Sequence, residues 1–120
     1  MTMPSVKVLS PQIAPERRGL LAKRLYADMK EFLKAPIIEV FYLTLDGVYA
    51  NGEENTGSHA ILEVEGPDIK KEFISRLSIN LCKSFQNESG YPDCHVAVVY
   101  HVNDKDHVGS IDGLLSERSK

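Results

Sequence analysis

Two stretches decide the fold, PERRGLLAKRLYADMKEFL at residues 15–33 and PDIKKEFISRLSINLCKSF at residues 67–85. A shift of 52 residues superimposes them without a gap and places apolar residues on apolar residues and basic residues on basic residues. The matched pairs are Arg18 with Lys70, Leu21 with Phe73, Arg24 with Arg76, Leu25 with Leu77, Met29 with Leu81 and Leu33 with Phe85. This match indicates that the chain contains one structural unit twice.

Each of these stretches has the features of an amphipathic helix. Apolar residues recur at spacings of three and four, which places them on one side of a helix. Both stretches begin with a proline followed by an acid, Pro15-Glu16 and Pro67-Asp68, an arrangement typical of a first helical turn. We therefore expect helices over residues 15–33 and 67–85.

Strand-like segments flank both helices, at residues 4–9, 37–45, 59–65 and 93–102. They are rich in β-branched and aromatic residues or alternate apolar with polar residues. Residues 51–58, rich in Gly, Asn and Glu, indicate an exposed loop between the two halves. The fold class is therefore α+β. We expect two βαβ units forming a four-stranded sheet, with both helices on one face because crossover connections are right-handed.

The face of this sheet without helices is expected to be apolar. It would carry Ala97 and Val99 and part of Phe41, Leu43 and Leu45. A monomer seldom leaves that much apolar surface in water. The pattern therefore predicts self-association.

The composition limits the classes of function. The chain has 120 residues and a formal net charge of -3, which fits one globular domain without the basic excess of a nucleic-acid-binding protein. The sequence contains neither an apolar run long enough to span a membrane nor a secretory leader. Cys82 and Cys94 form no CxxC motif and fall in apolar patterns. They predict reduced, buried thiols and a cytoplasmic location.

Pro4 stands at the start of the first predicted strand. A proline whose nitrogen begins a chain is a basic secondary amine, whereas a proline inside a chain is a tertiary amide without basicity. Met1, Thr2 and Met3 precede Pro4 in this sequence. Either translation begins at Met3, which is then removed, or Pro4 is a structural residue at the start of an edge strand.

The histidines do not predict a metal site. His95, His101 and His107 are spaced six residues apart, but His107 lies beyond the last strand in a polar segment. No acid or cysteine completes a set of ligands with them. We expect no bound metal.

Several short motifs resemble those of the tautomerase superfamily, which includes macrophage migration inhibitory factor. They are Met3-Pro4 opening a strand, Lys34-Ala35-Pro36 after the first helix, the Gly-rich middle loop, and a closing strand followed by Asn103 and Val108-Gly109. Two further motifs, Leu45-Asp46-Gly47-Val48-Tyr49 and Gly90-Tyr91-Pro92-Asp93, are most similar to a small bacterial branch of that superfamily. The resemblance covers residues 3–109.

The resemblance implies a tautomerase-like domain over residues 1–109. Residues 110–120 would form a C-terminal tail that is partly flexible or docks on a neighbouring subunit. It also implies a homotrimer with pockets at the subunit boundaries and no cofactor. The activity it implies is keto-enol tautomerisation of a small 2-oxo or unsaturated carboxylic acid, with the proline nitrogen as the base.

The same resemblance suggests site residues. Pro4 is the candidate catalytic residue and Lys34 the candidate substrate-binding lysine, although a lysine there also complements a helix C-terminus. His95 takes the place of a pocket tyrosine of migration inhibitory factor, either as a hydrogen-bond donor to substrate or as a half-exposed histidine of the sheet. An arginine that small bacterial tautomerases carry after the first strand is absent, since the chain has Ser10-Pro11-Gln12 there.

Two alternative functions remain open. The first is a non-catalytic trimer of the same fold that binds a small molecule or a protein, since Met1-Thr2-Met3 precede Pro4. The second is a ferredoxin-like regulatory module, which has the same order of helices and strands along the chain. A strand order other than two side-by-side parallel pairs would favour that module.

Overall fold

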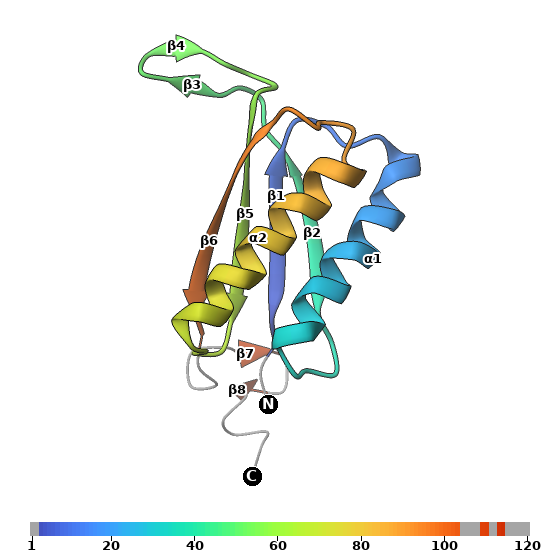
Figure 1. Ribbon diagram of the computed structural model, residues 1–120, viewed down its shortest axis with the longest axis vertical. Coiled ribbons are helices and arrows are strands. Elements are labelled where there is room, and N and C mark those ends of the chain that lie inside the picture. The colour runs from blue at the N-terminus through green and yellow to red at the C-terminus, as the bar shows by residue number, and fades with distance from the viewer. Residues whose placement is uncertain (1–2, 104–108, 111–112, 115–120) are drawn as a thin grey trace.

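The computed structural model describes residues 3–103, 109–110 and 113–114. It has two layers, a four-stranded sheet and a pair of helices that cover one face of it (Figure 1). The main elements are β1 (Ser5–Ser10), α1 (Pro15–Phe32), β2 (Glu39–Thr44), β5 (His59–Gly66), α2 (Lys71–Glu88) and β6 (His95–Val102). A short hairpin joins β3 (Tyr49–Ala50) to β4 (Glu53–Glu54), and β7 (Gly109–Ser110) pairs antiparallel with β8 (Gly113–Leu114).

The strand order confirms the predicted fold class. The sheet runs β2-β1-β5-β6, with β1 parallel to β2, β5 parallel to β6, and β1 antiparallel to β5. Each parallel pair is joined through its helix, so the two βαβ units lie side by side. This arrangement does not favour the ferredoxin-like module, for which a different strand order was expected.

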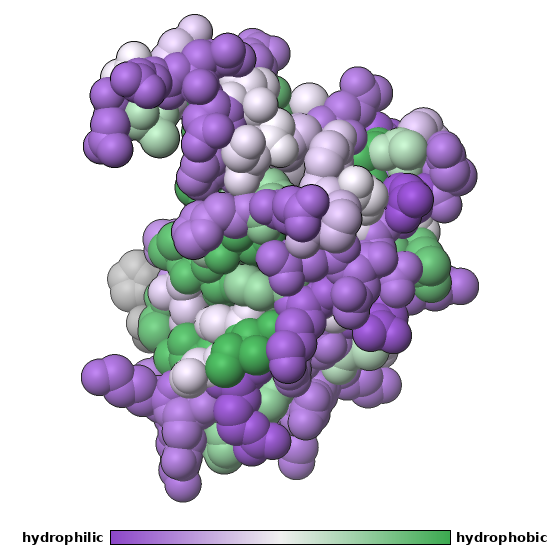
Figure 2. All heavy atoms as spheres, turned by 45° about the horizontal axis from the view of Figure 1, so that its top comes forward, coloured by the Kyte–Doolittle hydropathy of each residue, from purple (hydrophilic) through white to green (hydrophobic). Residues whose placement is uncertain are grey.

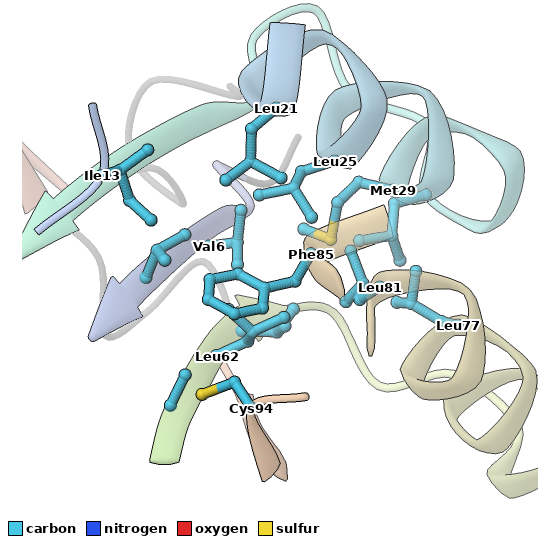
Figure 3. Packing of buried hydrophobic residues seen from close by; sticks show 14 residues of the cluster. Val6, Ile13, Leu21, Leu25, Met29, Leu62, Leu77, Leu81, Phe85 and Cys94 are labelled. Atoms are coloured by element: carbon cyan, nitrogen blue, oxygen red, sulfur yellow. The ribbon is translucent and has the colours of Figure 1, made fainter. Parts of the chain in front are cut away.

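The hydrophobic core lies between the sheet and the helices (Figure 3). The sheet contributes alternate residues of its two central strands, and the helices contribute their apolar sides. The fully buried side chains of the core include Val6, Val8, Leu62, Val64, Leu21, Leu25, Met29, Leu77, Leu81 and Phe85. Every helical residue in this group belongs to the periodic pattern found in the sequence.

One polar contact joins the two helices beside this core. The buried Ser84 hydroxyl on α2 donates a hydrogen bond of 2.5 Å to Oδ2 of Asp28 on α1. Burial raises the pKa of Asp28, and the hydrogen bond from Ser84 opposes that shift. The contact therefore links the two structural units at a carboxylate that is partly withdrawn from water.

The second helix begins later than the sequence predicted, at Lys71 and not at Pro67. Residues 67–70 lie outside the helix. The Pro67 carbonyl accepts a hydrogen bond of 2.6 Å from the Tyr100 hydroxyl on β6. Lys70 has extended angles (φ -58°, ψ 142°) and precedes the first helical residue. The helix then continues to Glu88, past the predicted end at residue 85, and Gly90 follows with φ +91°.

The middle loop contains the β3–β4 hairpin, which the sequence analysis did not predict. Asn51 and Gly52 form its turn with φ 54° and 80°, the left-handed values that a tight two-residue turn requires. The hairpin projects beyond the sheet (Figure 1), and Tyr49 on it is 70% exposed. Figure 2 shows a patch of hydrophobic residues, framed by polar ones, below the projecting hairpin.

The face of the sheet away from the helices, called here the open face, carries exposed apolar side chains, as predicted. Phe41, Leu43, Ile61 and Val99 lie on it and are between 39% and 45% exposed. Leu45 lies just beyond β2 and is half-buried. The chain therefore leaves large hydrophobic side chains uncovered on one side of its sheet.

Candidate functional site

Pro4 lies immediately before β1 and is buried. Its carbonyl accepts a hydrogen bond of 3.3 Å from the Glu39 N–H, which fixes the start of β1 beside the start of β2. Ser5, the next residue, pairs with Glu65 near the end of β5. We call this end of the sheet, where β1 and β2 begin and β5 and β6 finish, the Pro4 end.

Lys34 is exposed and lies at the same end of the domain. It follows Leu33, whose N–H donates to the Met29 carbonyl at 2.9 Å and closes α1. Leu33 packs over the last residue of β5, since a Cβ placed on Gly66 would lie 3.4 Å from Leu33 Cδ1. The fold thus brings Lys34 to the Pro4 end, as a shared site requires.

His95 does not lie near Pro4 in one chain. It is the exposed first residue of β6, and β6 runs from there to Val102 at the Pro4 end. The two ends of β6 are roughly 23 Å apart at the usual rise per residue. His95 instead lies beside His59, its partner in the register of β5 and β6. We call this opposite end the histidine end.

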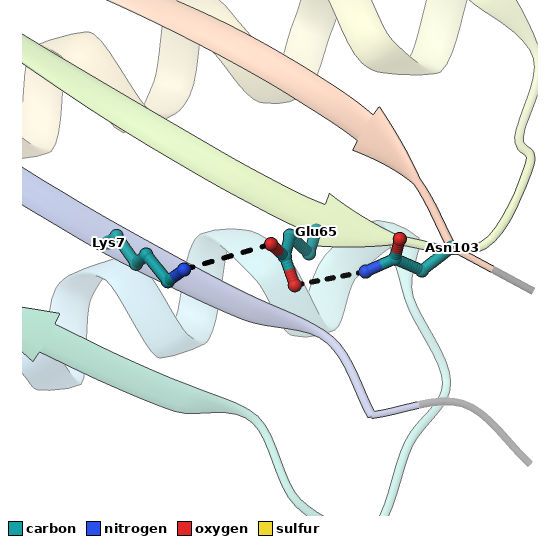
Figure 4. Close-up of polar contacts among 3 residues, drawn as sticks. All are labelled: Lys7, Glu65 and Asn103. Atoms are coloured by element: carbon teal, nitrogen blue, oxygen red, sulfur yellow. Dashed lines mark hydrogen bonds and ion pairs between the residues drawn. The ribbon is translucent and has the colours of Figure 1, made fainter. Parts of the chain in front are cut away.

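A polar network that the sequence analysis missed lies on the open face at the Pro4 end (Figure 4). Lys7 Nζ is 3.8 Å from Oε1 of Glu65, and Asn103 Nδ2 donates a hydrogen bond of 2.9 Å to Oε2 of the same carboxylate. The Asn103 N–H also donates to the Gly66 carbonyl at 2.7 Å. The network therefore holds a carboxylate and a half-exposed ammonium group a few residues from Pro4.

Only part of this network had a signal in the sequence. Asn103 was noted as a family feature, but Lys7 and Glu65 stand on different strands and far apart in the chain. Both occupy alternate strand positions that face away from the helices. That alternation could have placed them on the open face, but their pairing depends on the register of β1 against β5.

The loop after β1 contributes no cation. Ser10 Oγ donates to the Pro11 carbonyl at 2.7 Å, and the Gln12 carbonyl accepts a hydrogen bond from the Tyr91 hydroxyl. The side chains of the two arginines that follow in α1 donate hydrogen bonds to backbone carbonyls. Arg17 donates to the Glu88 carbonyl at 3.4 Å, and Arg18 donates to the Ile13 carbonyl at 3.0 Å. These contacts explain the arginines as structural residues.

The remaining reactive side chains also have structural roles. Burial raises the pKa of the free Cys82 and Cys94 thiols, which disfavours the nucleophilic thiolate. Burial, with a smaller contribution from Asp68, raises the pKa of Tyr100 to about 12. Tyr100 packs on the helix side of β6, and its hydroxyl donates a hydrogen bond to the Pro67 carbonyl.

Neither a cluster of metal ligands nor a membrane span is found in the part of the chain that the structure describes. Within residues 3–103, 109–110 and 113–114, no three His, Cys, Asp or Glu side chains come together as a metal site would require. Within the same residues, neither helix is long and apolar enough to cross a membrane. His107 lies outside the described residues.

Comparison with known proteins finds similarity in structure only. No protein-family model and no curated protein sequence matches the chain. The protein Pt0534, solved after inactivation by 2-oxo-3-pentynoate, superimposes with a TM-score of 0.77 at 19% identity, covering 98% of this chain and 99% of that one. Leishmania major MIF2 gives a TM-score of 0.77 at 17% identity over 93% of this chain and 97% of its own.

Two other solved structures extend this similarity. N1, a member of the cis-3-chloroacrylic acid dehalogenase family, gives a TM-score of 0.77 at 19% identity over 92% of this chain and 82% of that one. A fused 4-OT symmetric trimer gives a TM-score of 0.72 at 21% identity, covering 93% of this chain and 94% of that one. The chain therefore has the fold of these proteins, which confirms the fold that the resemblance to the tautomerase superfamily implied.

Proposed function

We propose that the protein is a tautomerase-like isomerase that moves a proton within a small 2-oxo or unsaturated carboxylic acid, with the Pro4 nitrogen as the base. The observation that carries the proposal is the position of Pro4, buried at the first residue before β1 in this fold. The fold neighbour Pt0534 is inactivated by 2-oxo-3-pentynoate, a 2-oxo acid, which supports this substrate class.

The chemistry needs a chain that begins at Pro4. A secondary amine in a buried position is less easily protonated than in water, so it can accept a proton near neutral pH. The amine would take a proton from the carbon next to the keto group, leaving an enolate. Return of that proton to the enolate oxygen gives the enol. No cofactor is required, because one amine both accepts and donates the proton.

Lys34 could contact the substrate from within the same chain as Pro4, whereas His95 could do so only from a neighbouring copy. The exposed Lys34 ammonium is at the Pro4 end and would hold the substrate carboxylate and stabilise the enolate. His95 lies at the histidine end, so it can contribute only if a neighbouring copy brings that end against Pro4. We propose a homotrimer that buries the exposed apolar side chains of the open face, such as Phe41 and Val99, as the fused 4-OT structures are described as trimers.

The other expectations from the sequence enter the proposal unchanged. A cytoplasmic protein would keep Cys82 and Cys94 reduced, and both are free thiols. The formal net charge of -3 favours neither a nucleic acid nor an anionic membrane surface as partner. The tail at residues 110–120, which includes Ser110 of β7 and the whole of β8, would be partly flexible or dock on a neighbouring subunit.

Two measurements test the proposal. Intact mass of the protein from its natural source shows whether residues 1–3 are removed. Phenylpyruvate enolisation is then compared between the chain that begins at Pro4, its Pro4→Ala variant and the chain that keeps Met3. We expect turnover by the first form alone, and a raised KM in Lys34→Gln.

Two results would contradict the proposed activity. One is an equal rate for the Pro4-start chain and its Pro4→Ala variant. The other is a natural protein that keeps Met3 and gives no turnover. Either result would leave the non-catalytic trimer as the better account of this fold.

A further inference from the structure

The histidine end carries two imidazoles side by side on the open face. His59 at the start of β5 and His95 at the start of β6 are partners in the parallel register. Their ring centroids are 5.4 Å apart and their planes meet at 65°. In this chain His59 is half-buried and His95 is exposed, so the pair is accessible from solvent. The strands β5 and β6 both begin at the top of the sheet in Figure 1.

This separation of the ring centroids is compatible with a shared metal ion. A Zn–N bond is about 2.0–2.1 Å, which puts each ring centroid about 3.2 Å from the ion. Two imidazoles at a tetrahedral angle then have centroids about 5.2 Å apart. The observed 5.4 Å differs little from that value, so rotation of the rings about their side-chain bonds, without a shift of β5 against β6, would let both bind one ion.

Asn55 contacts His59 where a ligating histidine usually has an outer partner. Its Nδ2 lies 3.0 Å from Nδ1 of His59 and donates to it in this orientation of the amide. Metal binding would require the amide to turn over, so that its oxygen accepts the Nδ1–H and the lone pair of Nε2 is free for the ion. The contact would also fix the orientation of the His59 ring, because the Asn55 backbone is itself held by a hydrogen bond of 2.7 Å from its N–H to the Val48 carbonyl.

We propose that His59 and His95 bind a divalent transition-metal ion such as Zn²⁺, Ni²⁺ or Cu²⁺, which imidazole ligands suit. No set of three His, Cys, Asp or Glu side chains forms among residues 3–103, 109–110 and 113–114, so water would fill the other positions. This site lies at the opposite end of the sheet from Pro4 and Lys34, so metal binding needs neither residue. It departs from the sequence expectation, which considered His95 with His101 and His107 and not with His59.

Metal binding would join the beginnings of β5 and β6. In the unfolded chain these histidines are 36 positions apart (95 - 59) and rarely meet. An ion that binds both therefore favours the folded state, and the stabilisation grows with the ratio of ion concentration to Kd. The expected consequence is a melting temperature that rises when Zn²⁺ or Ni²⁺ is added.

The test uses the full chain without a polyhistidine tag. Calorimetric titration with Ni²⁺ and Zn²⁺ is run on the parent chain, His59→Gln, His95→Gln and His101→Gln. His101 is the matched control because it lies on the same strand and the same face as His95 but pairs with Glu65. Asn55→Ala tests the outer contact, and thermal melting with and without metal gives a second measurement.

We expect His59→Gln and His95→Gln each to lower the affinity by about tenfold or more, and Asn55→Ala by about tenfold. His101→Gln should bind as the parent chain does. Equal affinity in the parent chain and the His59→Gln, His95→Gln double variant would mean an adventitious ion only and would overturn the proposal. A loss as large in His101→Gln would also overturn it.

Discussion

The two faces of the sheet differ in what covers them. On the helix side Val6, Val8 and Leu62 are fully buried, whereas Phe41 and Val99 on the open face are 44% and 42% exposed. One chain therefore completes only one core. The open face also carries the Lys7–Glu65–Asn103 network and the histidine pair. The difference indicates that the helix side stabilises the fold, while the open face is available to other copies and to ligands.

The largest effect is expected in the core on the helix side. Phe85→Ala removes a fully buried ring and should lower the free energy of unfolding by about 3–5 kcal/mol. Ile79→Ala on the same helix, at 52% exposure, is the control and should change it by less than about 1 kcal/mol. Urea unfolding at equal protein concentrations measures both. Similar losses would contradict the assignment of the core.

A smaller effect is expected where β5 ends against Tyr100. A Cβ at Gly66 would lie 2.7 Å from the Tyr100 hydroxyl oxygen, so Gly66→Ala should cost about 1–3 kcal/mol. Tyr100→Phe alone should cost about 1 kcal/mol, because the Pro67 carbonyl loses its donor. The double variant should cost less than the sum, since removing the hydroxyl also removes the clash. A strictly additive cycle in thermal or urea unfolding would show that the two groups do not touch.

The open face should affect assembly more than folding. Val99→Lys places a charge among exposed apolar side chains and should shift the solution mass to that of one chain. Stability of the separated subunit should change by no more than about 0.5 kcal/mol. Light scattering after gel filtration measures the mass, and Ile79→Lys on α2 is the control. If both variants keep the parent mass, the open face is not the interface.

The smallest effect concerns the contact between the helices. Burial raises the pKa of Asp28 in the folded chain, so folding favours the protonated acid there. Its contribution to stability therefore falls as the pH rises from about 3.8 through the higher folded pKa. Asp28→Asn keeps a partner for Ser84 and lacks this pH dependence. We expect the stability of the variant relative to the parent to increase with pH over that window in urea unfolding. A constant difference would contradict the raised pKa.

The sequence predicted the elements better than it predicted the site. The first helix was predicted over residues 15–33 and spans Pro15–Phe32, because the helical spacing of apolar residues can be recognised within one segment. The start of the second helix was wrong by four residues, since Tyr100 holds Pro67 outside it. Pro4 and Lys34 were found through short motifs, and the structure places both at the same end of the domain. The site roles of Pro4, Lys34 and His95 remain proposals.

The sequence by itself determined the two helices, their apolar sides and the α+β class, because the spacing of apolar residues within a segment reports local geometry. Only the tertiary structure decided the antiparallel join of β1 to β5, the contact of Lys7 with Glu65, and the place of His95 beside His59 and away from Pro4. These are pairings between strands. Their register depends on how the whole sheet packs against the helices, and no single segment of the chain carries that information.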